Sequence, residues 1–219
     1  MRNQPRLFIN GDLHAGASGP LDALQLHYLT RVMRTDKFLA FGGGLEFFAS
    51  VRGGDFVIGD STGRADPSGK WTFCFAPIKR VEDLVSFITQ MGVGVLQPVI
   101  TERTEARNVN WGRMRKIMIE AAEQSGRSSI PALRLPMSFT DLPKSGLIYG
   151  DERAPVDPWR GVLSFRSFPG PLRFLIGPEG GFSPSEFESL DSGDATGVSL
   201  GSTILRAEVA AIALCSKFL

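Results

Sequence analysis

This chain has few of the residues that build covalently or metal-stabilised folds. Its 219 residues include two cysteines and two histidines. Two cysteines cannot form a disulfide framework, and both stand in apolar segments, so we interpret Cys74 and Cys215 as buried, inert thiols in a reducing compartment. His14 and His27 lie too far apart in the sequence for a metal-ligand motif, so we expect no metal site.

Long hydrophobic runs and a strong net charge are also missing. The longest apolar run, Val209 to Cys215, is far shorter than the roughly 20 residues that cross a bilayer, and the first residues show no signal-peptide pattern. We therefore expect a cytoplasmic protein with no part in a membrane. A formal charge of +1 excludes a general attraction to nucleic acid, so contacts with RNA would have to come from local basic clusters.

The pattern of strands and helices divides the chain into two parts near residues 60–75. The first part, residues 1–68, has four short strand-like runs and a helical stretch at 21–33, which predicts a small, mostly β module. Residues 59–69 are rich in glycine, aspartate and serine and are interpreted as a linker. In residues 69–219 helices and strands alternate, which predicts an α/β domain with a mostly parallel sheet covered by helices. The expected helices are residues 81–91, 111–123, 184–190 and 203–218, and the expected strands are residues 93–100, 147–149, 173–176 and 197–200.

The chain is rich in glycine, and three glycines gather in the loop Gly177 to Gly181. This loop follows an apolar strand and precedes a helix whose start is specified by a capping box, Ser183 to Glu186. Most glycine-rich turns bind nothing, but ligands of open α/β sheets bind at the carboxyl ends of strands, where this loop falls. Phosphate-binding motifs do not fit, because no lysine with serine or threonine follows the glycines. We interpret the loop as rigid, bare backbone for another kind of ligand.

A second loop of the same kind lies near the C-terminal end. A strand ends at Leu200, a short turn follows, and the last helix is expected to begin at Thr203. Arg206 and Glu208 stand in the first turns of this apolar helix, where charges are costly unless they meet a partner, a ligand or solvent. The alternative is a purely structural turn before a buried, alanine-rich helix.

Together the two loops resemble the paired signature of the bacterial ribosomal RNA small-subunit methyltransferase E family. The signature residues are Leu175 to Ser183, Ser199 to Gly201 and Ile204 to Glu208. Further matching segments are Leu96 to Arg103, Glu123 to Arg127 and His27 to Arg34, so the resemblance extends over nearly the whole chain. Where the family usually has proline and arginine, this chain has Ser202 and Thr203.

The resemblance implies a fold, an activity and partners. Residues 69–219 would form a SPOUT-type α/β methyltransferase domain with a deep trefoil knot, and residues 1–68 would form a PUA-like, RNA-binding β-barrel. The protein would be a homodimer that methylates N3 of a uridine in 16S ribosomal RNA of the small ribosomal subunit. Its cofactor would be S-adenosylmethionine, held by backbone and apolar groups of the two loops. The cofactor-binding residues would be Leu175, Gly177, Gly180, Ser199, Leu200, Gly201 and Leu205.

The resemblance also implies roles for charged and polar residues. Arg206 would stabilise the uracil anion or its phosphate, while Glu208 or Glu179 would orient that arginine or accept a proton. A structural cap or ion pair is the alternative role for either carboxylate. The residues expected to contact RNA are Arg31 and Arg34, through phosphates, and Gln124, Ser125 and Arg127, at the base or the partner subunit.

The chemistry agrees with the scarcity of cysteine. Methylation at C5 of a pyrimidine generally needs a cysteine nucleophile, whereas N3 becomes nucleophilic on losing its proton. The site has only to hold the uracil in line with the methyl group and favour the anion. Two other functions stay open: another SPOUT RNA methyltransferase, acting on a ribose 2′-hydroxyl or a different base, and a non-catalytic RNA-binding protein of ribosome assembly.

Overall fold

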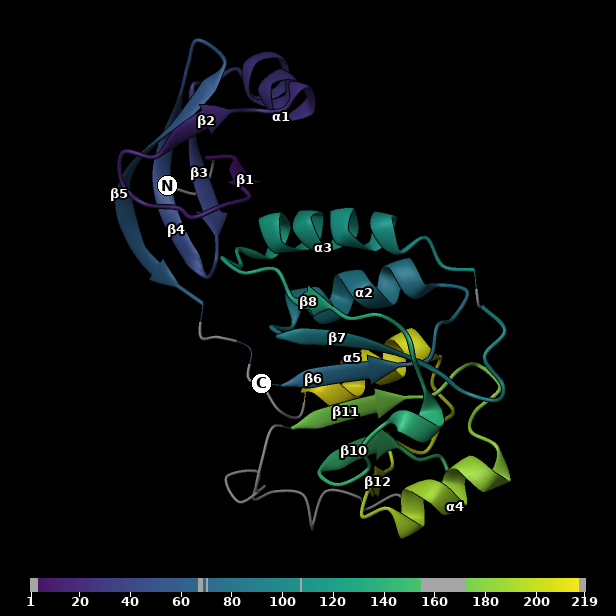
Figure 1. The fold of residues 1–219 in the computed structure, drawn as a ribbon. Helices are drawn as coiled ribbons and strands as arrows, with labels where there is room; N and C mark the ends of the chain where they lie inside the picture. The colour runs from purple at the N-terminus through teal and green to yellow at the C-terminus, as the bar shows by residue number, and fades with distance from the viewer. Residues whose placement is uncertain (1–3, 67–68, 70, 107, 155–171, 217–219) are drawn as a thin grey trace. The chain divides into compact units, whose positions relative to one another are not determined.

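The computed structural model describes residues 4–66, 69, 71–106, 108–154 and 172–216. The chain forms two compact units (Figure 1). The first unit combines Met1–Ser68 with Ile119–Ile130, and the second combines Gly69–Met118 with Pro131–Leu219. Within the described ranges, no helix has the length and hydrophobicity that a bilayer crossing requires.

The first unit is built on a five-stranded sheet with the strand order β1-β3-β4-β5-β2. Its strands are β1 (Arg6–Phe8), β2 (Ser18–Pro20), β3 (Lys37–Gly42), β4 (Leu45–Arg52) and β5 (Asp55–Ala65). β1 pairs with β3 in parallel, and the other pairs are antiparallel. The turn between β4 and β5 is Gly53 and Gly54, both at positive φ, as a two-residue hairpin turn requires. One face of the sheet packs on a core that includes Leu29, Phe38 and Ile58.

One expectation for the first unit is wrong, and another is confirmed with a difference in helix type. Residues 59–65 were expected in a linker, but β5 continues through Ala65 because its backbone pairs with β4 across register shifts. The polar residues there reflect an exposed strand face. The expected helix at 21–33 consists of α1 (Ala23–His27), started by an Asp22 capping box, and the π-helix η1 (Tyr28–Met33).

Arg6 binds the end of helix α3 (Trp111–Ser125) within the first unit. Its guanidinium forms an ion pair of 2.7 Å with the buried Glu46, and the Arg6 side chain is 12% exposed. It also donates to the carbonyls of Ala122, Glu123 and Arg127 at 3.0, 3.1 and 2.9 Å. A cation at this place adds a donor to carbonyls at and just after the helix end, where it also complements the helix dipole; the Ala122 carbonyl accepts in addition from the Arg127 N–H.

Asp66 binds the residues that follow α3. Its Oδ2 accepts hydrogen bonds from the backbone N–H groups of Ser128 and Ser129, both at 2.8 Å, and from the Ser129 hydroxyl at 2.7 Å. The guanidinium of Arg127 lies 3.6 Å away. Burial raises the pKa of Asp66, but these donors and the charge of Arg127 outweigh it, so the pKa is lowered. Residues 119–130 are therefore bound to the first unit at both Arg6 and Asp66.

The second unit contains a parallel sheet, which confirms the expected α/β class. The strand order is β12-β10-β11-β6-β7-β8, with β9 paired to β7, and every pair is parallel. The strands are β6 (Thr72–Phe75), β7 (Val95–Ile100), β8 (Ala132–Leu133), β9 (Met137–Ser138), β10 (Leu147–Gly150), β11 (Arg173–Ile176) and β12 (Thr196–Val198). The helices, besides the first part of α3, are α2 (Val81–Gln90), α4 (Pro184–Ser192), α5 (Ala207–Ser216) and the short 3₁₀ helix η2 (Phe139–Asp141).

Two further differences bear on the site. The sequence pattern did not predict β6, a four-residue strand between β11 and β7 in the sheet. The last helix was expected from Thr203 but begins at Ala207, and the strand before it ends at Val198 rather than Leu200. Ile204 is 87% exposed, so residues 203–206 have no buried face to hold a helical turn. They form a loop instead.

Candidate functional site

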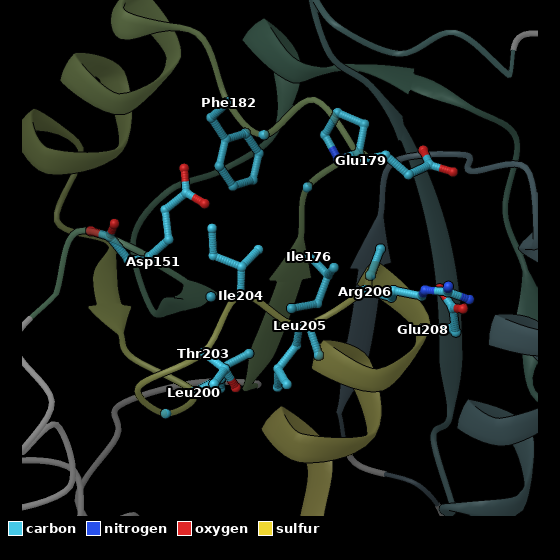
Figure 2. Close-up of a pocket in the computed structure, with 18 of the residues that line it drawn as sticks. Asp151, Ile176, Glu179, Phe182, Leu200, Thr203, Ile204, Leu205, Arg206 and Glu208 are labelled. Carbon is cyan, nitrogen blue, oxygen red and sulfur yellow. The ribbon is translucent and has the colours of Figure 1, made fainter.

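A cavity of about 540 Å³ lies in the second unit, where β10, β11 and β12 end. This volume is in the range of small-molecule sites, and the carboxyl edge of a parallel sheet is the usual place for one. Figure 2 shows the side chains around it. The lining residues come from 150–152, 176–179, 181–182 and 199–208, with Lys79, Arg80, Phe187 and Ala210.

The glycine-rich loop after β11 is fixed by the two neighbouring loops. Glu179 Oε1 accepts a hydrogen bond of 3.0 Å from the backbone N–H of Lys79, which follows β6. Arg103, which follows β7, donates to the carbonyl of Gly180 at 2.9 Å. Gly181 has a φ of +67° and donates to the carbonyl of Pro178 at 2.9 Å, which closes the turn. The loop is thus rigid before any ligand arrives.

Gly177 allows the Phe182 ring to form one wall of the cavity. A Cβ at Gly177 would lie only 3.1 Å from that ring. The ring is buried and packs edge-on against Tyr149 and Phe187. The expected capping box of α4 is present directly after it, because Ser183 and Glu186 bond to each other's backbone N–H groups.

The second loop supplies most of the opposite wall. Ser199 bonds to Gly201 through its side chain, with the Gly201 N–H donating at 3.3 Å and the Gly201 carbonyl accepting at 3.2 Å. Gly201 has a φ of +134°, which residues with a Cβ rarely adopt. Leu200, Leu205 and Ile176 give this part of the cavity an apolar surface (Figure 2).

Charged side chains stand at two sides of the cavity. In the view of Figure 2, Arg206 and Glu208 lie on one side and Asp151 on the other. Arg206 is exposed, whereas Glu208, in the first turn of α5, is only 8% exposed. Among the described residues, no hydrogen bond or ion pair of the Glu208 carboxylate is found. Glu208 lines the cavity, so its carboxylate can accept hydrogen bonds from water or from a ligand there.

The cavity collects most, but not all, of the residues expected to bind a cofactor or act in catalysis. Its lining includes Gly177, Glu179, Ser199, Leu200, Gly201, Leu205, Arg206 and Glu208. Leu175 is fully buried within β11 and does not line the cavity. Gly180 is exposed and faces Arg103, outside the lining.

The residues expected to contact RNA belong to the first unit, so the cavity does not include them. Arg31, in η1, and Arg34, at its end, are exposed. Gln124 and Ser125 are exposed at the end of α3. Arg127 is buried, with its guanidinium close to Asp66 and donating to Ser129 at 2.9 Å.

Sequence reasoning missed one whole segment of the cavity. Gly150 ends β10, Asp151 and Glu152 directly follow it, and all three line the cavity, as does Phe187 from α4. The rule that selected the glycine-rich loop, a position at the carboxyl end of a parallel strand, applies equally to residues 150–152. The strand at 147–149 was expected, so the signal was available.

Comparisons with known proteins place this geometry in context. The RNA methyltransferase domain family matches residues 66–219. Ribosomal RNA small subunit methyltransferase E of Rickettsia conorii is 36% identical over 132 residues, which cover 58% of this chain and 54% of that relative. The protein of the same name from Synechocystis sp. is 29% identical over 227 residues, covering 94% of this chain and 74% of the relative.

A solved structure is similar over almost the whole chain. It is the crystal structure of a ribosomal RNA small subunit methyltransferase E from Neisseria gonorrhoeae bound to S-adenosylmethionine. The TM-score is 0.83 at 25% sequence identity, and the match covers 98% of this chain and 96% of the other.

Proposed function

The chain belongs to the RNA methyltransferase family, and from this premise we propose that it uses S-adenosylmethionine to methylate N3 of a uridine in 16S ribosomal RNA. The observation that carries the proposal is the cavity at the ends of β10, β11 and β12, which five of the seven expected cofactor residues line. The names of the Rickettsia and Synechocystis relatives and the bound ligand of the Neisseria structure support the reaction and the cofactor.

The cavity suits S-adenosylmethionine in size and in chemistry. When bound, this cofactor supplies a methyl group on a positively charged sulfonium. Leu200, Leu205 and Ile176 offer an apolar surface for an adenine ring, and Gly177 and Gly201 leave backbone groups accessible beside it. The cavity volume of about 540 Å³ accommodates a ligand of this size.

We assign the proton transfer to Glu208. Glu208 lines the cavity and its carboxylate is bound by no other side chain within the described part of the chain, so it can accept the proton of uridine N3. Arg206, exposed at the same side, would balance the negative charge that the uracil acquires. Glu179 already accepts the N–H of Lys79, so we assign it to holding the glycine-rich loop.

The first unit is proposed to bind the RNA as a PUA-like barrel. Its curved five-stranded sheet supports this assignment, and the exposed Arg31 and Arg34 would contact phosphates. Gln124 and Ser125 are exposed and free to meet the RNA or a partner subunit. Arg127 is occupied by Asp66 and Ser129, so we assign it to fixing residues 127–129.

The proposal includes the deep trefoil knot and the homodimer that the family resemblance implies. The second unit keeps apolar side chains exposed that a partner subunit would cover. Phe87 on α2 is 38% exposed, Val209 on α5 is 44% exposed, and Ile204 lines the cavity at 87% exposure. We place the activity in the cytoplasm, where small ribosomal subunits are found.

The decisive experiment uses small ribosomal subunits from cells that lack the protein. Incubation with the purified protein and S-adenosylmethionine should methylate one uridine, stop reverse transcription there and yield 3-methyluridine on digestion. A methylated ribose would instead indicate another SPOUT enzyme. Binding of S-adenosylmethionine without transfer to either RNA or subunits would indicate a ribosome-assembly protein.

The assignment of Glu208 is tested with a matched pair of variants. Glu208→Gln should lower kcat by roughly 10²–10⁴-fold, because a lost acid-base group costs about that much. Its affinity for S-adenosylmethionine should be unchanged. Glu179→Gln keeps a side-chain oxygen that can accept from Lys79, so its kcat should stay near that of the wild type. Equal losses in both variants would contradict the assignment.

A further inference from the structure

A network of charged and aromatic side chains lies beside the cavity and has no part in the proposed chemistry. Its centre is Arg153, which follows β10. The guanidinium binds Asp151 with two nitrogens, Nε to Oδ1 at 3.0 Å and Nη2 to Oδ2 at 2.9 Å. Nη2 also lies 3.2 Å from Asp191 at the end of α4, and the guanidinium lies 3.6 Å from the centre of the Phe187 ring.

Tyr149 connects the carboxylates of Asp151 and Asp191. Its hydroxyl donates to Asp191 Oδ1 at 2.8 Å, lies 3.2 Å from Asp151 Oδ2 and accepts from Arg153 Nη2 at 3.2 Å. Burial and the hydrogen bond to Asp191 raise the pKa of Tyr149, so the hydroxyl keeps its proton. Burial would raise the pKa of Asp151, but the hydrogen bonds from Arg153 outweigh it and lower the pKa. At neutral pH Asp151 and Arg153 are therefore charged, while Tyr149 keeps its proton and can donate it to a carboxylate.

The network joins three segments of the cavity wall. Asp151 and Phe187 line the cavity themselves. Asp151 also donates its backbone N–H to the carbonyl of Val198 at 2.8 Å, directly before the second loop. A Cβ at Gly197 would lie 2.9 Å from both Asp151 Oδ2 and the Tyr149 hydroxyl, so β12 packs closely against the network. Asp151 is therefore coupled to the base of the loop that begins at Ser199 through both its backbone and its side chain.

We propose that Arg153 is a positioning residue for the cofactor site: it holds Asp151, Phe187 and the base of the second loop in the geometry that binds S-adenosylmethionine. The inference rests on the proposed function. Arginine is suited to this task because its planar fork binds a carboxylate with two nitrogens while its face stacks on an aromatic ring. Lysine can keep the charge but not both contacts.

Removing Arg153 has a defined structural effect. Asp151 is 7% exposed, and without the guanidinium its carboxylate keeps, among the described residues, only the backbone N–H of residue 153 and the Tyr149 hydroxyl as partners. A buried carboxylate that loses a cation turns toward water. The nearest space is the cavity, so the side chain would enter the volume that the cofactor needs.

The test compares Arg153→Met and Arg153→Lys with the wild type. The dissociation constant of S-adenosylmethionine is measured by calorimetry, and KM values are measured for S-adenosylmethionine and for small ribosomal subunits. Arg153→Met should raise the Kd and the KM for S-adenosylmethionine about tenfold or more, the loss expected for charge-assisted hydrogen bonds. The kcat and the KM for subunits should stay within about threefold of the wild-type values. The Kd and the KM of Arg153→Lys for S-adenosylmethionine should fall between those of the wild type and of Arg153→Met. A merely structural role would reduce the amount of active protein and leave KM unchanged.

Two further variants keep the test decisive. Arg113→Met is the matched control. The substitution removes an ion pair of 2.8 Å between Arg113 and Glu82 in the same unit, and Arg113 does not line the cavity. Its KM for S-adenosylmethionine should be that of the wild type. Asp191→Asn removes only the more exposed carboxylate and should raise that KM by about threefold, even if Arg153→Met does not fold.

The outcomes separate this inference from the proposed function. If folded Arg153→Met and Asp191→Asn bind S-adenosylmethionine as tightly as the wild type, the positioning role is overturned and the proposed function stands. If the wild type itself does not bind S-adenosylmethionine, the proposed function is overturned and the positioning role with it.

Discussion

Replacing Arg6 by methionine should destabilise the first unit by about 4 kcal/mol. The structure gives the reasons for this magnitude. The substitution leaves the carboxylate of Glu46, which is only 3% exposed, without its cation, and losing one partner of a buried pair costs about 3–5 kcal/mol. It also removes three hydrogen bonds to carbonyls at the end of α3, where a cation adds up to about 2 kcal/mol. Methionine has a similar length, so loss of packing volume contributes little.

Hydrogen exchange followed by mass spectrometry can measure this effect unit by unit. Peptides from β3, β4 and β5 should lose protection, while peptides from β11 and β7 should keep it, because the loss is confined to the first unit. For a unit of this size each kcal/mol corresponds to roughly 4–8 °C, so calorimetry should show its transition lowered by about 15–30 °C.

A double-mutant cycle decides whether the ion pair is the cause. Glu46→Leu alone leaves Arg6 without its carboxylate, but Glu46→Leu combined with Arg6→Met removes both charges. The double variant should therefore be more stable than Arg6→Met alone. A loss below about 1 kcal/mol for Arg6→Met, or a double variant less stable than it, would refute the reasoning.

Two other perturbations test the first unit and the cavity. The pKa of Asp66 is lowered in the folded state, so its stabilising effect is complete above the unfolded pKa of about 3.9 and is lost as the pH falls through the folded value. Asp66→Asn should weaken this acid dependence in urea unfolding curves, and an unchanged dependence would contradict it. Gly201→Ala forces a side chain into a φ of +134° and should cost about 1–3 kcal/mol and weaken S-adenosylmethionine binding. In Gly180→Ala the new Cβ would lie 3.5 Å from Arg103, an ordinary contact, so this variant should bind S-adenosylmethionine normally in calorimetry. Equal losses of affinity in the two variants would show that strain at Gly201 is not the cause.

The parts of the site that the sequence predicted are those with local causes. The segment from β11 to α4 was correct because proline, glycines and a capping box, all within a dozen residues, specify each step. The start of α5 was wrong because helix propensity continues through Ile204, and only the lack of a buried face there excludes the helix. Strand β6 was missed because its four residues are mostly buried, so they show no alternation of polar and apolar side chains.

Interactions between distant residues could not be predicted in this way. Arg153 and Asp191 are 38 positions apart, and Arg6 and Ala122 are 116 positions apart. A charged residue in a sequence indicates a solvated surface until its partner is known, and no local pattern identifies the partner. The network around Arg153 and the attachment of residues 119–130 were therefore invisible before the fold was known.

The attachment of residues 119–130 to the first unit makes its folding depend on sequence far beyond residue 68. A fragment that stops at residue 68 would contain Arg6 and Asp66 but none of the carbonyls and serines that they bind. Residues 1–68 could not be exchanged between relatives as one continuous segment, since residues 119–130 would have to be exchanged with them. Substitutions at the end of α3 and in β1 should therefore co-vary among relatives.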